Sequence, residues 1–275
     1  MEEAAKPHNL EPWVVQFGSM KYNMDTLVYE FLVMGALIAL ALVVRRGLSV
    51  EAPGRLQVMI EGLFEFIGTL VRDSLGEYGK KIIPPLAFTL FLFILLANWI
   101  ELIPFGIPLP AGHGGEWEIV PVKAATADLN VSLALGLVVI LLVHFYSVKA
   151  KGVIGYLSSY FVEPLTRDGL GIPKGIWPFV IPLVFAFNFV LRVAEELGKL
   201  ISLPMRLFGN IFAGGIIFFL IALLPIYALP FADIFWRGWS TLIGGIQAFV
   251  FALLTIVYTK LATTHHEHDE KGGEH

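Results

Sequence analysis

Arg206 lies in a stretch of sequence, residues 202–210, that is otherwise compatible with the interior of a membrane. Arginine keeps its positive charge at any accessible pH. At the centre of a membrane helix such a charge costs about 2.5–3.5 kcal/mol even on the most lenient scale. No acidic residue lies within one helical turn of Arg206, and strongly apolar sequence follows directly after it. A charge without a partner in its own helix indicates a counter-charge elsewhere, for example on another subunit.

Steps of three or four residues place a set of polar side chains on one face of a helix: Glu195, Lys199, Ser202, Arg206 and Asn210. Glu195 and Lys199 also have the spacing of an ion pair within a helix, as do Arg192 and Glu196. These four charges fit two interpretations. One is a structural ion ladder at the membrane interface, and the other is a site that handles ions.

A second polar position, Gln247, interrupts a later apolar segment. Ser240 precedes it by seven residues and Tyr258 follows by eleven, so the three fall near one helical face. The adjacent Gly244 and Gly245 weaken a helix by about 1 kcal/mol each relative to alanine, and close helix packing can offset that loss. Gln247 therefore either bonds a neighbouring helix or takes part in the site around Arg206.

The composition identifies a membrane protein. Of 275 residues, 56% are hydrophobic and 15% are charged, whereas soluble domains carry about 25% charge. The net charge of −4 and the absence of a basic tract argue against nucleic-acid binding. With no cysteine, disulfides and thiolate metal sites are excluded. The acidic start lacks the basic segment and apolar core of a cleaved signal peptide.

The elements that carry these residues are apolar stretches near the roughly 20 residues that a bilayer requires: 26–44, 82–103, 129–148, 174–226 and 232–261. They predict an all-α polytopic membrane protein with about five membrane-embedded helices, the last two long and strongly tilted. Residues 56–75 have one apolar and one polar helical face, which predicts an amphipathic helix that lies on the inner surface, or covers other spans, rather than crossing the membrane. No internal repeat is present, so the inverted-repeat plan of many transporters is not supported.

Lysine and arginine follow the first span and fill the region between the third and fourth, whereas the loop 105–127 holds only Lys123 against Glu116 and Glu118. The positive-inside rule then predicts an external N-terminus and a cytoplasmic C-terminus. The predicted layout is an external segment 1–25, one membrane domain 26–262 with an external loop at 105–127, and a disordered cytoplasmic tail 263–275. The histidine-rich stretch 265–270 could bind a metal, but a solvated, mobile terminus is the preferred interpretation and no metal site is assigned.

The residues 203–210 (Leu-Pro-Met-Arg-Leu-Phe-Gly-Asn), with 247–251 and 254–258 one helix later, resemble subunit a of the F-type ATP synthase. The segments 98–104 and 127–131 support the resemblance, which covers nearly the whole chain from about residue 25. The resemblance implies a non-catalytic stator subunit of the cell inner membrane, without cofactor. Its partners would be a ring of c subunits, peripheral-stalk b subunits and the lipid bilayer, and the hairpin 174–261 would face the ring.

The resemblance also assigns roles to residues. Arg206 would be the gating charge between two half-channels that lead protons to and from a carboxylate on each c subunit. The remaining site residues would be Asn210, Gln247 and Ser202 near the arginine, Asp128 and Asn130 in the outer half-channel, and Glu195 and Glu196 in the inner one. Gly215 and Ser240 stand where many members carry titratable residues, so the outer path rests on Asp128, on water, and on Glu30, Glu101, Glu116 or Glu118.

Two other classes of function compete with this one. An autonomous secondary transporter or channel would use Arg206 to bind an anionic substrate, and would take up solute as a purified chain. A structural membrane scaffold would tolerate Leu in place of Arg206. The absent repeat and the lone arginine argue against the transporter.

Overall fold

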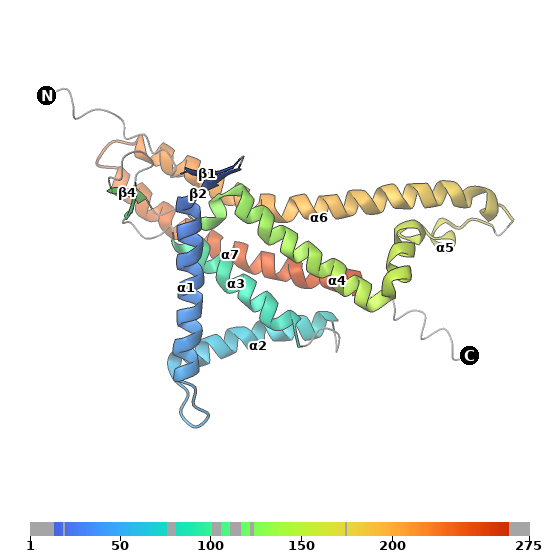
Figure 1. Cartoon of the computed structure of the whole chain (residues 1–275), viewed down its shortest axis with the longest axis horizontal. Coiled ribbons are helices and arrows are strands. Elements are labelled where there is room, and N and C mark those ends of the chain that lie inside the picture. The colour runs from blue at the N-terminus through green and yellow to red at the C-terminus, as the bar shows by residue number, and fades with distance from the viewer. Residues whose placement is uncertain are drawn as a thin grey trace. The chain divides into compact units, whose positions relative to one another are not determined.

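The computed structural model describes residues 14–18, 20–75, 81–100, 106–110, 117–121, 124–173 and 175–263. Most of them are helical, and Figure 1 labels the helices in chain order. The helices are α1 (Met24–Arg46), α2 (Arg55–Leu75), α3 (Ile83–Trp99), α4 (Leu129–Val162), α5 (Arg167–Leu170), α6 (Trp177–Ala222) and α7 (Leu229–Thr263), with a 3-10 turn η2 (Ala125–Ala127). The all-α prediction is confirmed.

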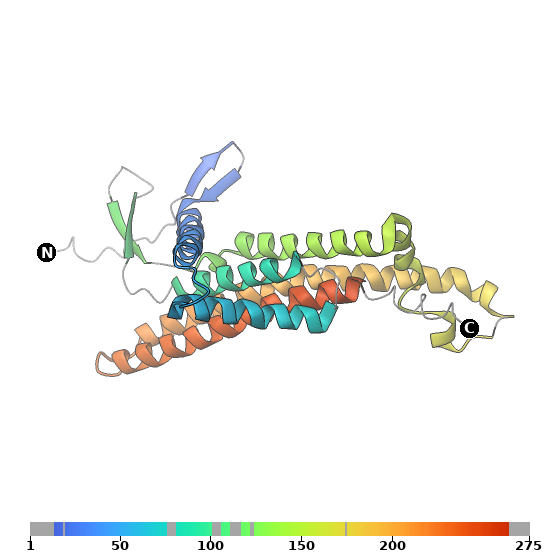
Figure 2. The ribbon, with the colours of Figure 1, turned by 90° about the horizontal axis from the view of Figure 1, so that it is seen from below.

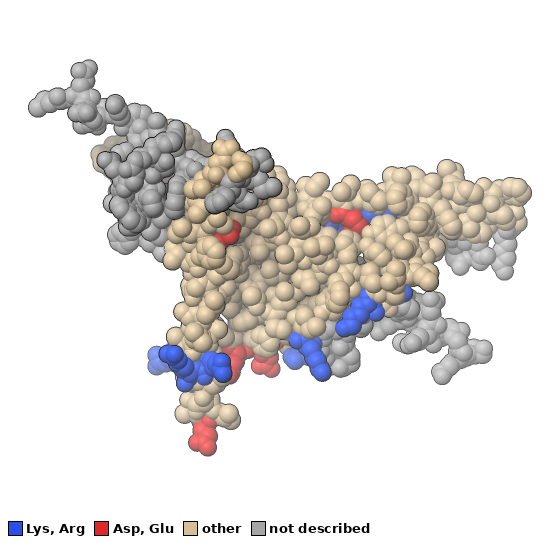
Figure 3. All heavy atoms as spheres, in the orientation of Figure 1, with Lys and Arg blue, Asp and Glu red and all other residues tan. Residues whose placement is uncertain are grey.

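Within the described residues, four helices are long and apolar enough to cross a membrane: Thr26–Arg46 in α1, and α4, α6 and α7. A fifth apolar helix, α3, has 17 residues. These helices agree with the expected polytopic membrane architecture, and α3 occupies part of the expected second span. Figure 3 shows the corresponding surface, on which charged side chains form a few separate groups among uncharged residues.

The last two long helices exceed the thickness of a membrane. With 46 and 35 residues, α6 and α7 are about 69 and 52 Å long at 1.5 Å per residue. The hydrocarbon core is about 30 Å thick, so each helix must tilt or continue beyond the core. The polar region at 192–210 does not interrupt α6, which also contains Pro182 and Pro204.

The amphipathic helix expected over 56–75 is present as α2. Its Ile67 and Val71 side chains are buried, at 1% and 0% exposure, whereas Glu65 and Arg72 are exposed. Phe64 of α2 packs edge-on against Phe88 of α3, with ring centroids 5.3 Å apart. The apolar face of α2 is thus covered by protein at Ile67 and Val71, whereas Leu56 and Met59 near the start of the helix stay exposed.

Two antiparallel hairpins were not predicted from the sequence. β1 (Val14–Phe17) pairs with β2 (Met20–Asn23), and β3 (Gly106–Pro110) pairs with β4 (Trp117–Pro121). Figure 2 shows the two strands of each hairpin side by side. The strands have four or five residues and three of the ten residues of β3 and β4 are proline. Such segments are too short for a period of two to stand out, and proline weakens a strand assignment.

The chain divides into two compact units. The first comprises Met1–Glu61, Thr89–Asp128 and Asn210–Phe249, and the second comprises Gly62–Phe88, Leu129–Gly209 and Val250–His275. In the first unit, Tyr29 and Val33 of α1 form a buried cluster with Ala97 of α3. In the second, Ser147 Oγ of α4 donates a hydrogen bond of 3.3 Å to the carbonyl oxygen of Ala262 in α7. The domain limits expected from the sequence stay predictions.

The close approach of α4 to α6 within the second unit depends on a glycine. A Cβ atom added to Gly136 would lie 2.7 Å from Cγ and 2.9 Å from Cδ of Pro204. A proline ring is tied to the backbone, so it cannot swing away as a flexible side chain would. Pro204 is buried and lies two residues before Arg206, so this contact fixes the part of α6 that carries the arginine.

We predict that Gly136→Ala destabilises the protein. Overpacking costs about 1–3 kcal/mol, which exceeds the gain of about 1 kcal/mol in helix propensity. Thermal unfolding of the purified protein in detergent would measure the change as a lower Tm. The matched control is Gly35→Ala in α1, where nothing lies within 4 Å of the added Cβ. Equal Tm values for the two variants would contradict the prediction.

Candidate functional site

Arg206 has no partner among the residues that the structure describes. The guanidinium is exposed on α6 and makes neither a hydrogen bond nor an ion pair with any described residue. Its neighbours Leu203, Pro204 and Leu207 are buried, so these three side chains hold the helix while the arginine points away from the packed side. Ser202, one turn earlier, is exposed as well. The charge is therefore positioned by apolar packing and left available to a group outside this part of the chain.

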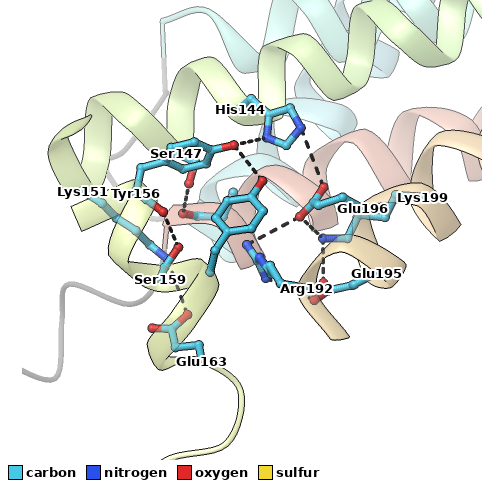
Figure 4. Close-up of polar contacts among 12 residues, drawn as sticks. His144, Ser147, Lys151, Tyr156, Ser159, Glu163, Arg192, Glu195, Glu196 and Lys199 are labelled. Atoms are coloured by element: carbon cyan, nitrogen blue, oxygen red, sulfur yellow. Dashed lines mark hydrogen bonds and ion pairs between the residues drawn. The ribbon is translucent and has the colours of Figure 1, made fainter. Parts of the chain in front are cut away.

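Four charged residues of α6 form an ion-pair cluster two to four turns before Arg206 (Figure 4). Lys199 Nζ lies 2.6 Å from Glu195 and 3.1 Å from Glu196. Arg192 lies 3.1 Å from Glu195 and 3.6 Å from Glu196. Both ion pairs expected from the spacing are present, each acid being shared by both cations. Lys199 is 8% exposed, so this member of the predicted polar stripe points inward instead of sharing the face of Arg206.

A cavity of about 180 Å³ lies among α3, α6 and α7 in the first unit. Asn210 and Ser240, predicted separately from the sequence, both line it, together with Asn98, Gly214, Trp236 and Gly244 among others. Trp236 Nε1 is buried and has no hydrogen-bond acceptor among the described residues. Buried polar groups normally have a partner, and a cavity of this size with several polar groups in its lining has room for ordered water. The geometry therefore favours a hydrated pocket.

Asn98 holds α3 against α7 at this cavity. Its amide nitrogen donates a hydrogen bond of 3.2 Å to the carbonyl oxygen of Gly244, and its amide oxygen accepts one of 2.8 Å from Thr126. A Cβ on Gly244 would lie 3.1 Å from that of Asn98, so the glycine permits the approach. Sequence reasoning missed Asn98 and Trp236 as site residues. The polar Asn98 in an apolar span and the Gly244–Gly245 pair were the available signals.

Asp128 belongs to a separate polar group in the first unit. Its carboxylate accepts hydrogen bonds from Asn23 Nδ2 at 3.0 Å and from Thr26 Oγ1 at 3.4 Å. Glu30, one turn after Thr26 on α1, is half-buried. Asn130 is exposed in the first turn of α4. Asp128 is thus held directly after η2, by one donor from the end of β2 and one from the first turn of α1.

Gln247 is 9% exposed on α7, and its Nε2 is buried without a hydrogen-bond partner among the described residues. An orphaned amide at this depth is unusual in a folded protein. Glu101, Glu116 and the histidine-rich stretch 265–270 lie outside the described residues, and Glu118 lies in β4. Within the described residues, no group of three or more His, Asp or Glu side chains could hold a metal ion.

Comparison with known proteins gives a consistent match. A family model described as ATP synthase A chain matches residues 27–260. ATP synthase subunit a of Idiomarina loihiensis is 36% identical over 270 residues, which cover 94% of this chain and 95% of that protein. The same subunit of Acidothermus cellulolyticus is 35% identical, covering 96% and 88%, and that of Buchnera aphidicola subsp. Baizongia pistaciae is 34% identical, covering 92% and 85%.

The hydrated pocket can be tested by cysteine substitution, because the chain has no cysteine of its own. We predict that Ser240→Cys, which lines the cavity, reacts with a small water-soluble thiol reagent. Water is needed to form the reactive thiolate. The matched control, Ala248→Cys, lies on the same helix at 0% exposure and should react at least roughly tenfold more slowly. Equal labelling rates, followed by mass spectrometry, would show that the cavity is not accessible to water.

Proposed function

We propose that this chain, which belongs to the ATP synthase subunit a family, conducts protons past a ring of c subunits. Arg206 would be the gating counter-charge. The chain is a multi-pass membrane subunit of an F-type ATP synthase, and it serves ion transport and ATP synthesis within that complex. The catalytic chemistry on ATP belongs to other subunits.

One observation carries the proposal: an exposed arginine on an apolar helix, without a counter-charge in the described part of the chain. A carboxylate on a passing c subunit would supply that charge. Arg206 would attract the carboxylate when it is ionised and disfavour it when it is protonated. In a medium of low dielectric constant this attraction is strong. It must also stay weak enough to release the carboxylate as the ring turns.

The outer half-channel is proposed to run through the cavity lined by Asn98, Asn210 and Ser240. None of the described residues that line this cavity is titratable, and Gly215 is not among them. Protons would therefore move here along ordered water, with amide and hydroxyl groups orienting the molecules. Asp128 would act nearer the outer surface, together with Asn130.

The inner half-channel is proposed to use Glu195 and Glu196. Intramembrane carboxylates are typical proton relays, and these two are held by Arg192 and Lys199 in a defined geometry. Ser202 lies between this cluster and Arg206 along α6 and would orient water between them. Gln247 would likewise orient water. With this assignment the N-terminus is external, the C-terminus is cytoplasmic, and b subunits complete the stator.

We predict that Arg206→Ala abolishes ATP-driven proton pumping in membrane vesicles and leaves assembly intact. The side chain is exposed and makes no hydrogen bond or ion pair with a described residue, so its removal should not unfold α6. Quenching of a pH-sensitive dye measures pumping, and co-purification with the c ring measures assembly. Coupled pumping by the variant would exclude a gating role. Solute uptake by the purified chain alone would favour an autonomous transporter instead.

Arg206→Lys separates charge from shape. Lysine keeps a positive charge but loses the planar guanidinium that binds a carboxylate through two hydrogen bonds. We expect pumping to fall roughly tenfold or more, which corresponds to about 1.4 kcal/mol at the rate-limiting step. A pumping rate equal to that of the unmodified protein would show that any point charge suffices, and would contradict a role for the bidentate geometry.

A further inference from the structure

His144 of α4 faces the inner charged cluster and has no part in the function proposed above. Its Nε2 lies 3.9 Å from Glu196 Oε2, within ion-pair distance. On the opposite side of the ring, Nδ1 lies 3.1 Å from the hydroxyl of Tyr156. Figure 4 shows the imidazole between the two groups. The histidine side chain is 29% exposed and that of Glu196 is 14% exposed, so His144 is the more accessible of the two.

A bend in α4 creates this arrangement. His144 and Tyr156 are twelve residues apart in sequence, which is about 18 Å along a straight helix. Gly152 adopts φ 71° and ψ 167° and breaks the helix between them, a conformation that glycine reaches without strain. The segment after Gly152 turns back, as Figure 1 shows for α4. Tyr156 thereby reaches a ring nitrogen that it could not approach on a continuous helix.

The two oxygens of Glu196 differ in their surroundings. Oε1 is 3.1 Å from Lys199 Nζ and 3.6 Å from Arg192. Oε2 is buried and has no hydrogen-bond donor among the described residues. A buried acceptor without a donor is destabilising. The group that faces it at ion-pair distance is His144 Nε2, 3.9 Å away, which is about 1 Å beyond hydrogen-bond length.

Two tyrosines fix the opposite side of the imidazole. The hydroxyl of Tyr156 lies 2.8 Å from that of Tyr160, and Arg192 stands over the Tyr160 ring at 5.7 Å. If Nδ1–H donates to Tyr156, and Tyr156 donates to Tyr160, every hydrogen bond in the series has one donor and one acceptor. Nδ1 then keeps its proton in both charge states of the ring. Nε2 becomes the nitrogen that gains and loses a proton.

We propose that His144 exchanges protons with Glu196, and that Tyr156 and Tyr160 position its ring. In the transfer step, the Nε2–H bond of the imidazolium breaks and an O–H bond forms at Glu196 Oε2, leaving a neutral imidazole and a neutral carboxylic acid. A hydronium ion from the bath then protonates Nε2 and leaves a water molecule, while Glu196 passes its proton onward and becomes a carboxylate again; the reverse sequence releases a proton to the bath. This inference rests on the proposed inner half-channel and adds a residue that controls access to it.

The titratable and charged groups around His144 come from three helices. They are Lys151, Tyr156 and Tyr160 of α4, Glu163 directly after it, Arg192, Glu195, Glu196 and Lys199 of α6, and Tyr258 of α7, whose ring lies 5.7 Å from Lys199 Nζ. Within the cluster on α6, two cations and two carboxylates offset one another.

The test is the rate of ATP-driven proton pumping by the reconstituted complex as a function of pH on the side to which ATP is added. Proton exchange at His144 should make the rate of the unmodified protein change in a step as that pH is varied. His144→Gln keeps a hydrogen-bonding side chain but cannot titrate. We expect it to lower the rate roughly threefold or more and to remove the step. Free imidazole in the bath should restore part of the rate.

Tyr156→Phe gives an independent measurement, because it leaves the imidazole in place and removes its partner at Nδ1. We expect the step to move along the pH axis while the complex still assembles. The matched control is Tyr227→Phe, at a tyrosine that is 77% exposed outside the long helices, and it should leave the profile unchanged. A lower rate in His144→Gln with an unchanged pH profile and no imidazole rescue would show a structural role and overturn the proposal.

Arg206→Ala, measured in the same preparation, tests the proposed function separately from the role of His144. If Arg206→Ala does not pump and His144→Gln has the rate and pH profile of the unmodified protein, His144 is not a proton-exchange residue and the proposed function stands. If Arg206→Ala pumps normally, the proposed function fails. If His144→Gln does not assemble, an unchanged profile in Tyr156→Phe overturns the inference, and a shifted one supports it.

Discussion

Hydrocarbon offers a polar side chain neither a hydrogen bond nor a counter-ion, so each polar group within a membrane helix must find both in protein or in trapped water. The polar residues of this chain meet that condition in different ways. Arg192, Glu195, Glu196 and Lys199 neutralise one another. Arg206 stands apart, because no described residue offers it a charge. The chain is electrostatically incomplete at this position, and the proposed function follows from that incompleteness.

Short-range features of the site could be predicted from the sequence. Spacings of three and four residues predicted the ion pairs of α6. The lack of an acidic residue near Arg206 in the sequence indicated that this charge is unpaired within its own helix. Contacts between distant parts of the chain could not be predicted in this way. The hydrogen bond from Asn98 to Gly244 joins residues 146 positions apart, and no local pattern encodes which helices meet. The glycine pair only indicated that something approaches closely.

Backbone irregularities were the other features that sequence reasoning missed. Gly152 lies in a segment whose neighbours favour a helix, and it adopts a positive φ that glycine reaches readily. The β3–β4 hairpin forms from proline-containing segments with weak strand preference. A pattern of hydrophobic residues reports neither feature. The bend in α4 matters most, because it brings Tyr156 to His144 and so completes the surroundings of Glu196.

The continuity of α6 has a consequence for what its sequence can tolerate. Glu196 and Arg206 are ten residues apart on one helix, which fixes about 15 Å along the axis and sets the angle between the two side chains. Inserting one residue between them would rotate one against the other by about 100°, and no adjustment elsewhere could restore both. Substitutions in this interval change chemistry one position at a time. A change of length would alter the register of the whole helix, because α6 fixes both the spacing and the relative direction of the two side chains.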